Sequence, residues 1–252
     1  MDSPARRGAG ISGLAGYPPA MSQTATKLTE MYEAMRERFG PQGWWPAGPG
    51  PARQVKLEIC VGAILTQNTN WRNVEKAVAN LSAAGCIGVA SLHAKPHAEL
   101  AELIRPAGYF NVKAKRLKNF IAAVHERFGD DIEAFLDRPA AALREELLAI
   151  NGIGRETADS IILYAARKLS FVVDAYTYRI LLRHGLISPA DDYEAIKELF
   201  EGALPDDLEL WNDYHAQLVA VGKTFCRPRA RCDGCPLERF PHDPLAGAGQ
   251  DY

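Results

Sequence analysis

The sequence contains no run of about 18 or more apolar residues and no layout typical of a signal peptide. We therefore expect no membrane partner and a cytoplasmic location. Net charge is also low, at −2 at pH 7. Overall charge thus gives no reason to expect nucleic-acid binding, and any such binding must rest on local patches.

Cysteine is scarce, with five residues in 252. Three of the five lie between Cys226 and Cys235, which is not typical of a secreted disulfide framework. In a reducing compartment, such clustering favours metal ligation.

The remaining composition is that of an ordinary globular protein, with 47% hydrophobic and 24% charged residues. The length suffices for one large or two modest domains. Residues 1–22 are the exception, because they are rich in Gly, Ala, Pro and Ser and have no hydrophobic period. We predict a disordered tail there, with Met21 as an alternative start.

Hydrophobic periodicity predicts an all-α protein. Apolar positions recur at helical spacing and are interrupted by Gly and Pro. The predicted helices cover residues 24–39, 57–65, 71–84, 111–128, 131–136, 139–149, 155–168, 175–185, 193–204 and 208–223, with one or two short helices between 88 and 104.

Two glycines, Gly152 and Gly154, separate two of these helices and predict a tight helical hairpin. The amides of Ile153, Gly154 and Arg155 would lie at a helix N-terminus, where a phosphate oxygen binds readily. Twenty residues after the second glycine, Asp174 ends a short apolar run and opens the next helix. Asp174 is interpretable as an N-cap alone or as a catalytic carboxylate.

The hairpin followed by Val-Asp resembles the helix-hairpin-helix (HhH-GPD) DNA glycosylase superfamily, in particular its endonuclease III-like members. The resemblance extends from Leu57 to Cys235. It implies a two-lobed, all-α fold with a DNA cleft and a C-terminal cysteine-cluster loop. One domain would be the helical barrel at 55–168, and the other would combine 23–54 with 169–252. The implied protein is monomeric, is associated with the nucleoid, and binds double-stranded DNA carrying a damaged base.

In this family a damaged nucleotide leaves the duplex before its N-glycosidic bond is cleaved. The resemblance assigns Asp174 to catalysis, with water as the nucleophile. It assigns Gln67 to the gap that the flipped nucleotide leaves, and places Asn68 against the DNA. Glu58 is a candidate for a second carboxylate, and His215 is interpreted as a hydrogen-bonded helix histidine.

Trp44, Trp45 and Pro46 precede the first barrel helix and resemble an element of bacterial 3-methyladenine glycosylases. With Trp71 they are the available surfaces for stacking a base, although the tryptophans are also interpretable as core anchors. This resemblance predicts an alkylated purine as substrate, since cation–π attraction favours a cationic base.

Bifunctional members carry a lysine two residues after the second glycine, where this chain has Glu156. We therefore predict a monofunctional glycosylase without AP lyase activity, and expect Glu156 to point away from DNA. The alternatives are an endonuclease III-like glycosylase/lyase acting on oxidised pyrimidines, an enzyme removing mismatched adenine or thymine/uracil, and a non-catalytic DNA-binding protein.

The spacing Cys226-x5-Cys232-x2-Cys235 resembles the iron–sulfur loop of endonuclease III-like glycosylases, which implies a structural [4Fe–4S] cluster. Pro241 stands where a fourth cysteine is expected. His242 is a candidate fourth ligand, which would also permit a zinc site, and a metal-free loop is the third possibility. In each case the loop would present arginines to phosphate, namely Arg227, Arg229 and Arg231.

The predicted helix 111–128 carries four basic residues near its start: Lys113, Lys115, Arg116 and Lys118. Such a run is interpretable as a solvated face or as a DNA contact.

Overall fold

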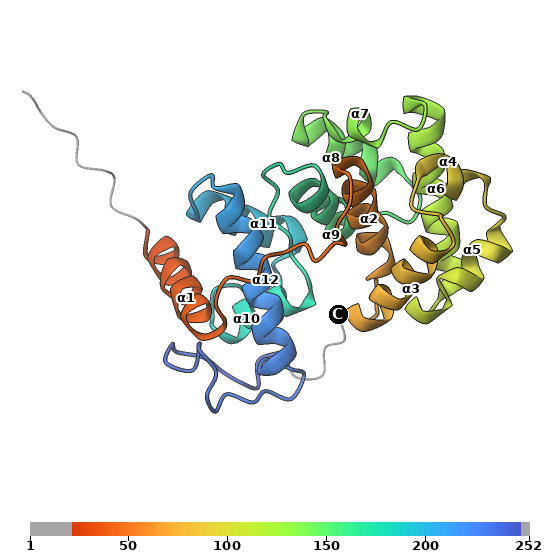
Figure 1. Ribbon diagram of the computed structural model, residues 1–252. Helices are drawn as coiled ribbons and strands as arrows, with labels where there is room; N and C mark the ends of the chain where they lie inside the picture. Colours follow the sequence, from red (N-terminus) through yellow and green to blue (C-terminus); the bar gives the residue numbers. More distant parts are fainter. Residues whose placement is uncertain (1–21, 248–252) are drawn as a thin grey trace, which may run out of the picture.

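The computed structural model describes residues 22–247 (Figure 1). Most of the predicted tail, including Met21, lies outside the described residues. Ser22 belongs to the fold, because its side chain accepts a hydrogen bond from the Ala25 amide and caps the first helix.

The described residues form helices and loops without a strand, which confirms the predicted all-α class. The helices are α1 (Gln23–Phe39), α2 (Ala52–Leu65), α3 (Trp71–Ala83), α4 (Val89–Ala94), α5 (His97–Leu103), η1 (Arg105–Ala107), α6 (Phe110–Phe128), α7 (Ile132–Leu136), α8 (Ala140–Ala149), α9 (Arg155–Ser160), η2 (Ile161–Ala165), α10 (Ala175–Arg183), α11 (Tyr193–Ala203) and α12 (Leu208–Thr224). In these residues no helix is both long and apolar enough to span a membrane.

Helix α2 is the centre of one group of helices. It is apolar on nearly all sides from Leu57 to Leu65, as expected for a helix enclosed by others. It contacts α3, α6, α7, α9 and η2, while α4 and α5 pack on α6 (Figure 1).

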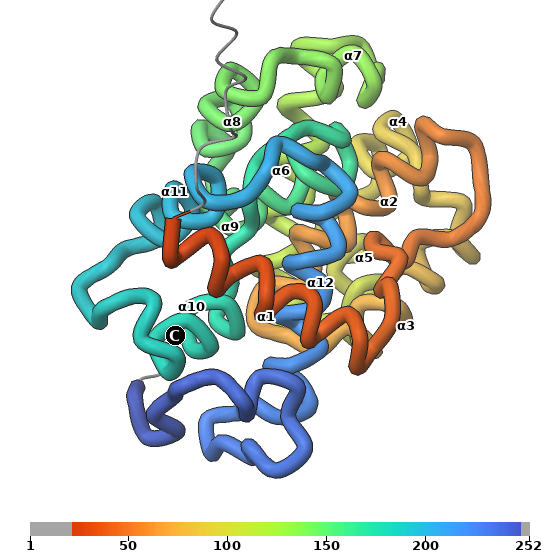
Figure 2. The backbone as a smooth tube through the Cα atoms, turned by 90° about the vertical axis from the view of Figure 1, so that its left-hand side faces the viewer, coloured from red at the N-terminus to blue at the C-terminus, as the bar shows by residue number. Residues whose placement is uncertain are grey.

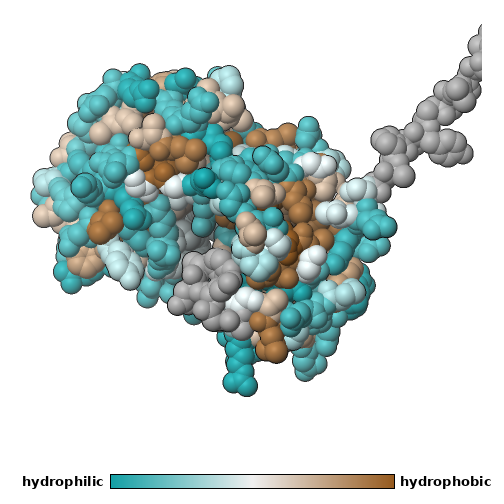
Figure 3. Space-filling model, turned by 180° about the vertical axis from the view of Figure 1, so that it is seen from behind, coloured by the Kyte–Doolittle hydropathy of each residue, from teal (hydrophilic) through white to brown (hydrophobic). Residues whose placement is uncertain are grey.

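A second group joins the two ends of the chain. Helix α1 packs on α12 and α11, and α10 packs on α12. The segment after α12 runs along the end of this group, below α10 (Figure 2). Viewed from behind, the surface is mostly hydrophilic and apolar residues gather in a few patches (Figure 3).

The predicted helix 155–168 changes form partway. After α9 ends at Ser160, Ile161–Ala165 form a π-helical turn, and all five of these residues are buried. The wider turn rotates the following side chains relative to a regular helix. It places Tyr164 beside the tryptophans of the candidate site.

Candidate active site

A wide cleft of about 1430 Å³ brings together segments that are far apart in the sequence. It lies along the hairpin, the N-terminus of α10 and one face of α12. Its lining includes the following residues predicted for catalysis, base binding or DNA contact: Trp44, Trp45, Pro46, Gln67, Asn68, Trp71, Gly152, Ile153, Gly154, Arg155 and Asp174. Their shared location is a structural finding, while the roles assigned to them stay predictions.

Asp174 is both an N-cap and a cleft carboxylate. Its Oδ1 accepts bonds from the Thr177 amide at 2.7 Å and the Thr177 hydroxyl at 2.9 Å. Its Oδ2 faces His215 Nε2 at 3.6 Å. Burial would raise the pKa of Asp174, but His215 and the bonds from Thr177 outweigh burial and hold the pKa below its usual value.

His215 departs from the sequence interpretation. Its Nδ1 lies 2.5 Å from the Tyr164 hydroxyl, but its buried Nε2 has no hydrogen-bond partner in the described structure. The interpretation as a fully bonded helix histidine is therefore wrong. A signal was present in the sequence, because His215, Val219 and Lys223 recur every four residues and line the cleft from one face of α12.

Glu156, which we expect to point away from DNA, lines the cleft. It is the second residue of α9 and is exposed to solvent. Desolvation by the surrounding protein, and then the negative charge of Asp174, raises the pKa of Glu156 to about 7. Glu58 is not part of the lining, and it accepts a bond from the Gly48 amide at 2.7 Å.

The tryptophans form an aromatic wall. The Trp45 ring packs at edge-on angles against Tyr164 and Trp71, with centroids 5.1 and 5.2 Å away. Beneath it lies Gly62, where a Cβ would come within 3.2 Å of the ring. Trp44 meets the His215 ring edge-on at 6.0 Å. Both tryptophans are half-buried, so they are anchored and still reach the cleft.

Side chains of α12 hydrogen-bond to the loop that precedes Trp44. The Asp213 carboxylate accepts bonds from the Gln42 amide at 2.8 Å and the Tyr32 hydroxyl at 2.9 Å. Gln217 donates to the Gly40 carbonyl at 2.6 Å. These bonds set the path of the chain as it enters the aromatic wall.

Gln67 is tied to the hairpin. Its amide nitrogen donates to the Gly152 carbonyl at 3.1 Å and the Thr157 hydroxyl at 2.9 Å, and its oxygen accepts from Arg116. Gly152 has φ +99°, and an added Cβ would collide with the Arg116 side chain. Glycine is required at 152 for both reasons.

The basic residues of α6 divide into two kinds. Lys113 is buried and donates to the Leu65 and Ala107 carbonyls at 2.9 and 2.7 Å, and burial lowers its pKa to about 8. Lys118 donates to the carbonyls that end α4. Lys115 and Arg116 instead line a second groove beside Gly152. Neither sequence interpretation of this run holds for all four residues.

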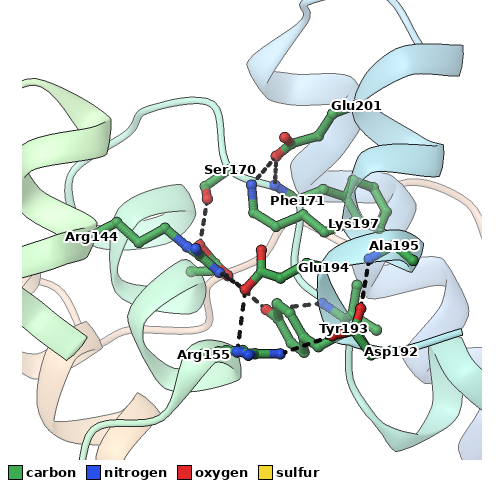
Figure 4. A network of polar contacts seen from close by, with 12 residues as sticks. Arg144, Arg155, Ser170, Phe171, Asp192, Tyr193, Glu194, Ala195, Lys197 and Glu201 are labelled. Atoms are coloured by element: carbon green, nitrogen blue, oxygen red, sulfur yellow. Dashed lines mark hydrogen bonds and ion pairs between the residues drawn. The ribbon is translucent and has the colours of Figure 1, made fainter.

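Arg155 pairs with two carboxylates at the start of α11, those of Asp192 and Glu194 (Figure 4). Its guanidinium lies 3.3 Å from Glu194 Oε1 and 3.5 Å from Asp192 Oδ2. Glu194 also pairs with Arg144, which binds the fully buried Asp159 through two nitrogens at 2.8 and 3.0 Å. The network joins α8 and α9 to the start of α11.

The three clustered cysteines line one small cavity together with His184 and His242. Over residues 22–247, however, no three or more metal-binding side chains are placed to hold an ion. Burial raises the pKa of Cys235 to about 11. His242 is turned by a 2.8 Å contact between its Nδ1 and the Phe240 carbonyl. As placed, these residues do not fit the implied cluster.

The loop carrying these cysteines is instead held by Arg183 of α10. Its guanidinium donates to Cys226 Sγ at 3.2 Å and to the carbonyls of Arg227 and Pro228 at 2.7 and 2.8 Å. Arg183 therefore anchors the loop.

Comparison with known proteins supports this geometry. The chain is 47% identical over 214 residues to a Methanocaldococcus jannaschii protein provisionally named a DNA repair glycosylase, covering 84% of this chain and 94% of the relative. It is 29% identical over 186 residues to endonuclease III of Thermotoga maritima, covering 72% and 80%.

Solved structures agree with this result. The Helicobacter pylori 3-methyladenine DNA glycosylase MagIII, bound to 1,N6-ethenoadenine, has a TM-score of 0.67 and 30% identity, covering 79% of this chain and 97% of that one. An endonuclease III–DNA complex has a TM-score of 0.71 at 20% identity, which shows the fold alone; it covers 88% and 97%. The family model for HhH-GPD superfamily base excision DNA repair proteins matches residues 61–206. The chain belongs to the HhH-GPD superfamily of base excision DNA repair proteins.

Proposed function

We propose that this DNA glycosylase is monofunctional and hydrolyses the N-glycosidic bond of an alkylated purine in double-stranded DNA. The observation that carries the proposal is the single cleft in which Asp174, the hairpin, Gln67 and the aromatic wall meet. In that arrangement one carboxylate lies beside the place where a backbone is gripped and a base is stacked.

Binding begins with the backbone and the base. The hairpin amides bind a phosphate, and the damaged nucleotide rotates out of the duplex at a cost of a few kcal/mol. Stacking on Trp44 or Trp45 stabilises the extruded base by about 1–3 kcal/mol. Gln67 exchanges its bonds with Gly152 and Thr157 for contacts within the vacated stack.

Asp174 then acts on the sugar. Departure of the base leaves an oxocarbenium-like deoxyribose, which a nearby carboxylate stabilises. Because Thr177 occupies Oδ1, the oxygen available to the sugar or to an attacking water is Oδ2. The lowered pKa of Asp174 keeps the group ionised at neutral pH.

The charges around the aromatic wall support this substrate class. Asp174 and Glu156 face a cleft lined by tryptophans, and both favour a cationic base. The similarity to the H. pylori enzyme, solved with a modified adenine, supports the same class. A panel of duplexes with one modified base each, treated with alkali after incubation, tests it. Alkylated purines should yield strand breaks, and cleavage confined to oxidised pyrimidines would contradict the proposal.

The absence of lyase chemistry needs a separate test. Glu156 cannot form a Schiff base, but Lys223 is the single lysine among the described lining residues, and burial lowers its pKa. Borohydride should trap no covalent adduct with lesion DNA. An adduct that is lost in Lys223→Gln would support the glycosylase/lyase alternative.

Asp174→Asn separates catalysis from binding. The asparagine preserves the N-cap, so the fold and the affinity for duplex DNA should be retained while base release is lost. Base release that continues at the wild-type rate would favour another catalytic group. If the wild type releases no base from any duplex, the non-catalytic DNA-binding alternative gains support.

For the cysteine loop, we propose a structural role anchored by Arg183, whatever its metal content. Iron and zinc analysis of the purified protein distinguishes a cluster, a zinc site and a metal-free loop. A yellow-brown protein containing iron would mean that the loop rearranges despite Pro241.

A further inference from the structure

A chain of three polar side chains runs from the interior to Asp174. Tyr164 comes from η2, His215 from α12, and Asp174 from the N-terminus of α10. The Tyr164 hydroxyl lies 2.5 Å from His215 Nδ1, and His215 Nε2 lies 3.6 Å from Asp174 Oδ2. Tyr164 and His215 are buried, and the Asp174 side chain is 12% exposed.

The Tyr164 hydroxyl lies 2.5 Å from His215 Nδ1 and 3.5 Å from the Asn212 carbonyl, and the shorter contact favours donation to the imidazole. Burial, followed by the charge of Asp174, raises the pKa of Tyr164, so the phenol keeps its hydrogen. When that hydrogen is donated to Nδ1, the proton of the neutral ring lies on Nε2. The opposite tautomer would point a lone pair at the Asp174 carboxylate. The Nε2–H tautomer is therefore favoured.

This Nε2–H group has no bond within the described structure, because 3.6 Å is longer than a hydrogen bond. A buried donor without a partner is costly and rare in proteins, and such groups gather at functional sites. The carboxylate oxygen that it faces is the one that Thr177 leaves free. A small rotation of either side chain would close the gap.

Trp44 lies against the same imidazole. Its ring meets the His215 ring edge-on with centroids 6.0 Å apart, and it also contacts Tyr164 at 6.1 Å. A base that stacks on Trp44 would therefore contact a ring that packs directly against His215 and Tyr164. The base pocket and the carboxylate are connected by direct packing.

We propose that His215, oriented by Tyr164, is a positioning residue that donates to Asp174 Oδ2 when a base enters the cleft and aims the carboxylate at the sugar. The inference rests on the glycosylase activity proposed above. It adds that a base bound at the aromatic wall orients the Asp174 carboxylate through His215.

Two substitutions at one position test the link. His215→Gln keeps an N–H donor near the position of Nε2, whereas His215→Asn is too short to reach Asp174. We expect the asparagine variant to lower the single-turnover excision rate on the order of 10- to 100-fold, the size of one charge-assisted hydrogen bond. The glutamine variant should recover most of the rate, and both should bind duplex DNA like the wild type. Equal rates in the two variants would overturn the proposal.

The pH profile is a second readout, which a purely structural role would leave unmoved. Without His215 the acid limb of the excision rate should shift to higher pH, because Asp174 loses a group that lowers its pKa. The other titratable groups that interact with Asp174 are unchanged in the variants: Glu156, Tyr164, Tyr176 and Lys223.

The tautomer is measurable without any activity. Nitrogen-15 NMR of labelled histidine should show His215 protonated on Nε2 in the full chain, and a ring protonated on Nδ1 would overturn the inference. Wild-type inactivity on every duplex would instead reject the proposed function. The two failures are therefore distinguishable.

Discussion

At the scale of single residues, Asp174 has two uses that its sequence context presents as alternatives. One oxygen caps α10 and the other faces the cleft. The position of Asp174 after an apolar run predicted the N-cap, whereas its catalytic role was predicted from the family resemblance and stays a prediction. Its partner His215 was not predictable in that way, because the two residues meet only when α10 packs on α12. The place of Glu156 in the cleft lining was not predictable either, since it depends on how α9 packs in the fold.

Glu156 should make stability depend on pH. Its pKa is about 7 in the folded protein and near 4.5 when unfolded, so its contribution is favourable below pH 4.5 and is lost as pH rises through 7. Glu156→Gln should raise the melting temperature at pH 8 and change it little at pH 4.5. Glu145→Gln, on an exposed part of α8, is the control. A shift of equal size at both pH values would contradict the assignment.

Gly62 should act through Trp45. In an ordinary helix, Gly→Ala stabilises by about 0.4–1 kcal/mol, as expected for the control Gly202→Ala, where no atom lies within 4 Å. At Gly62 the new methyl would meet the Trp45 ring at 3.2 Å and displace it. Gly62→Ala should therefore alter tryptophan fluorescence and slow base excision. An excision rate equal to that of Gly202→Ala would argue against a role for the Trp45 position.

At the scale of elements, most helix positions follow from hydrophobic period and from Gly and Pro. The predicted helix 131–136 is matched by α7 within one residue at its start, because Asp131 caps it through two amides. The π-turn at Ile161–Ala165 was not predictable, since its four aliphatic residues and the ring of Tyr164 fit a regular helical period equally well. The burial of Lys113 was not predictable from the sequence either, because one of its partners, the Leu65 carbonyl, comes from a helix that is distant in the sequence.

Lys113 and Lys115, two residues apart on α6, should behave oppositely. Lys113→Met leaves the buried Leu65 and Ala107 carbonyls unpaired, which should cost about 1–3 kcal/mol of unfolding free energy and loosen the turn that carries Gln67. Lys115→Met is exposed in the groove beside the hairpin and should leave stability within about 0.5 kcal/mol while weakening DNA binding. Urea unfolding and DNA titration of both variants measure this. Equal losses of stability in the two variants would contradict a structural role for Lys113 that Lys115 does not share.

At the scale of the whole molecule, the two groups of helices are joined by charges as well as by packing. Buried Asp159 binds Arg144, Ser170 and Tyr193, so α8 and α9 are linked to the chain that enters α11 (Figure 4). Asp192, which this network reaches through Arg155, lines the cleft beside the hairpin. With a net charge of only −2, local placement of charge decides where DNA is attracted.

Asp192 should therefore restrain DNA binding. It lies 3.5 Å from Arg155 and caps α11 through the Ala195 amide at 3.0 Å. Asp192→Asn keeps the cap and removes a negative charge from the cleft wall, so Arg155 becomes available to a phosphate. We expect duplex affinity to rise roughly 2- to 10-fold at low salt, with the difference shrinking as salt screens the charge. Asp206→Asn, exposed and outside the cleft lining, removes the same charge elsewhere. If both variants bind equally well, net charge and not the contact with Arg155 is responsible.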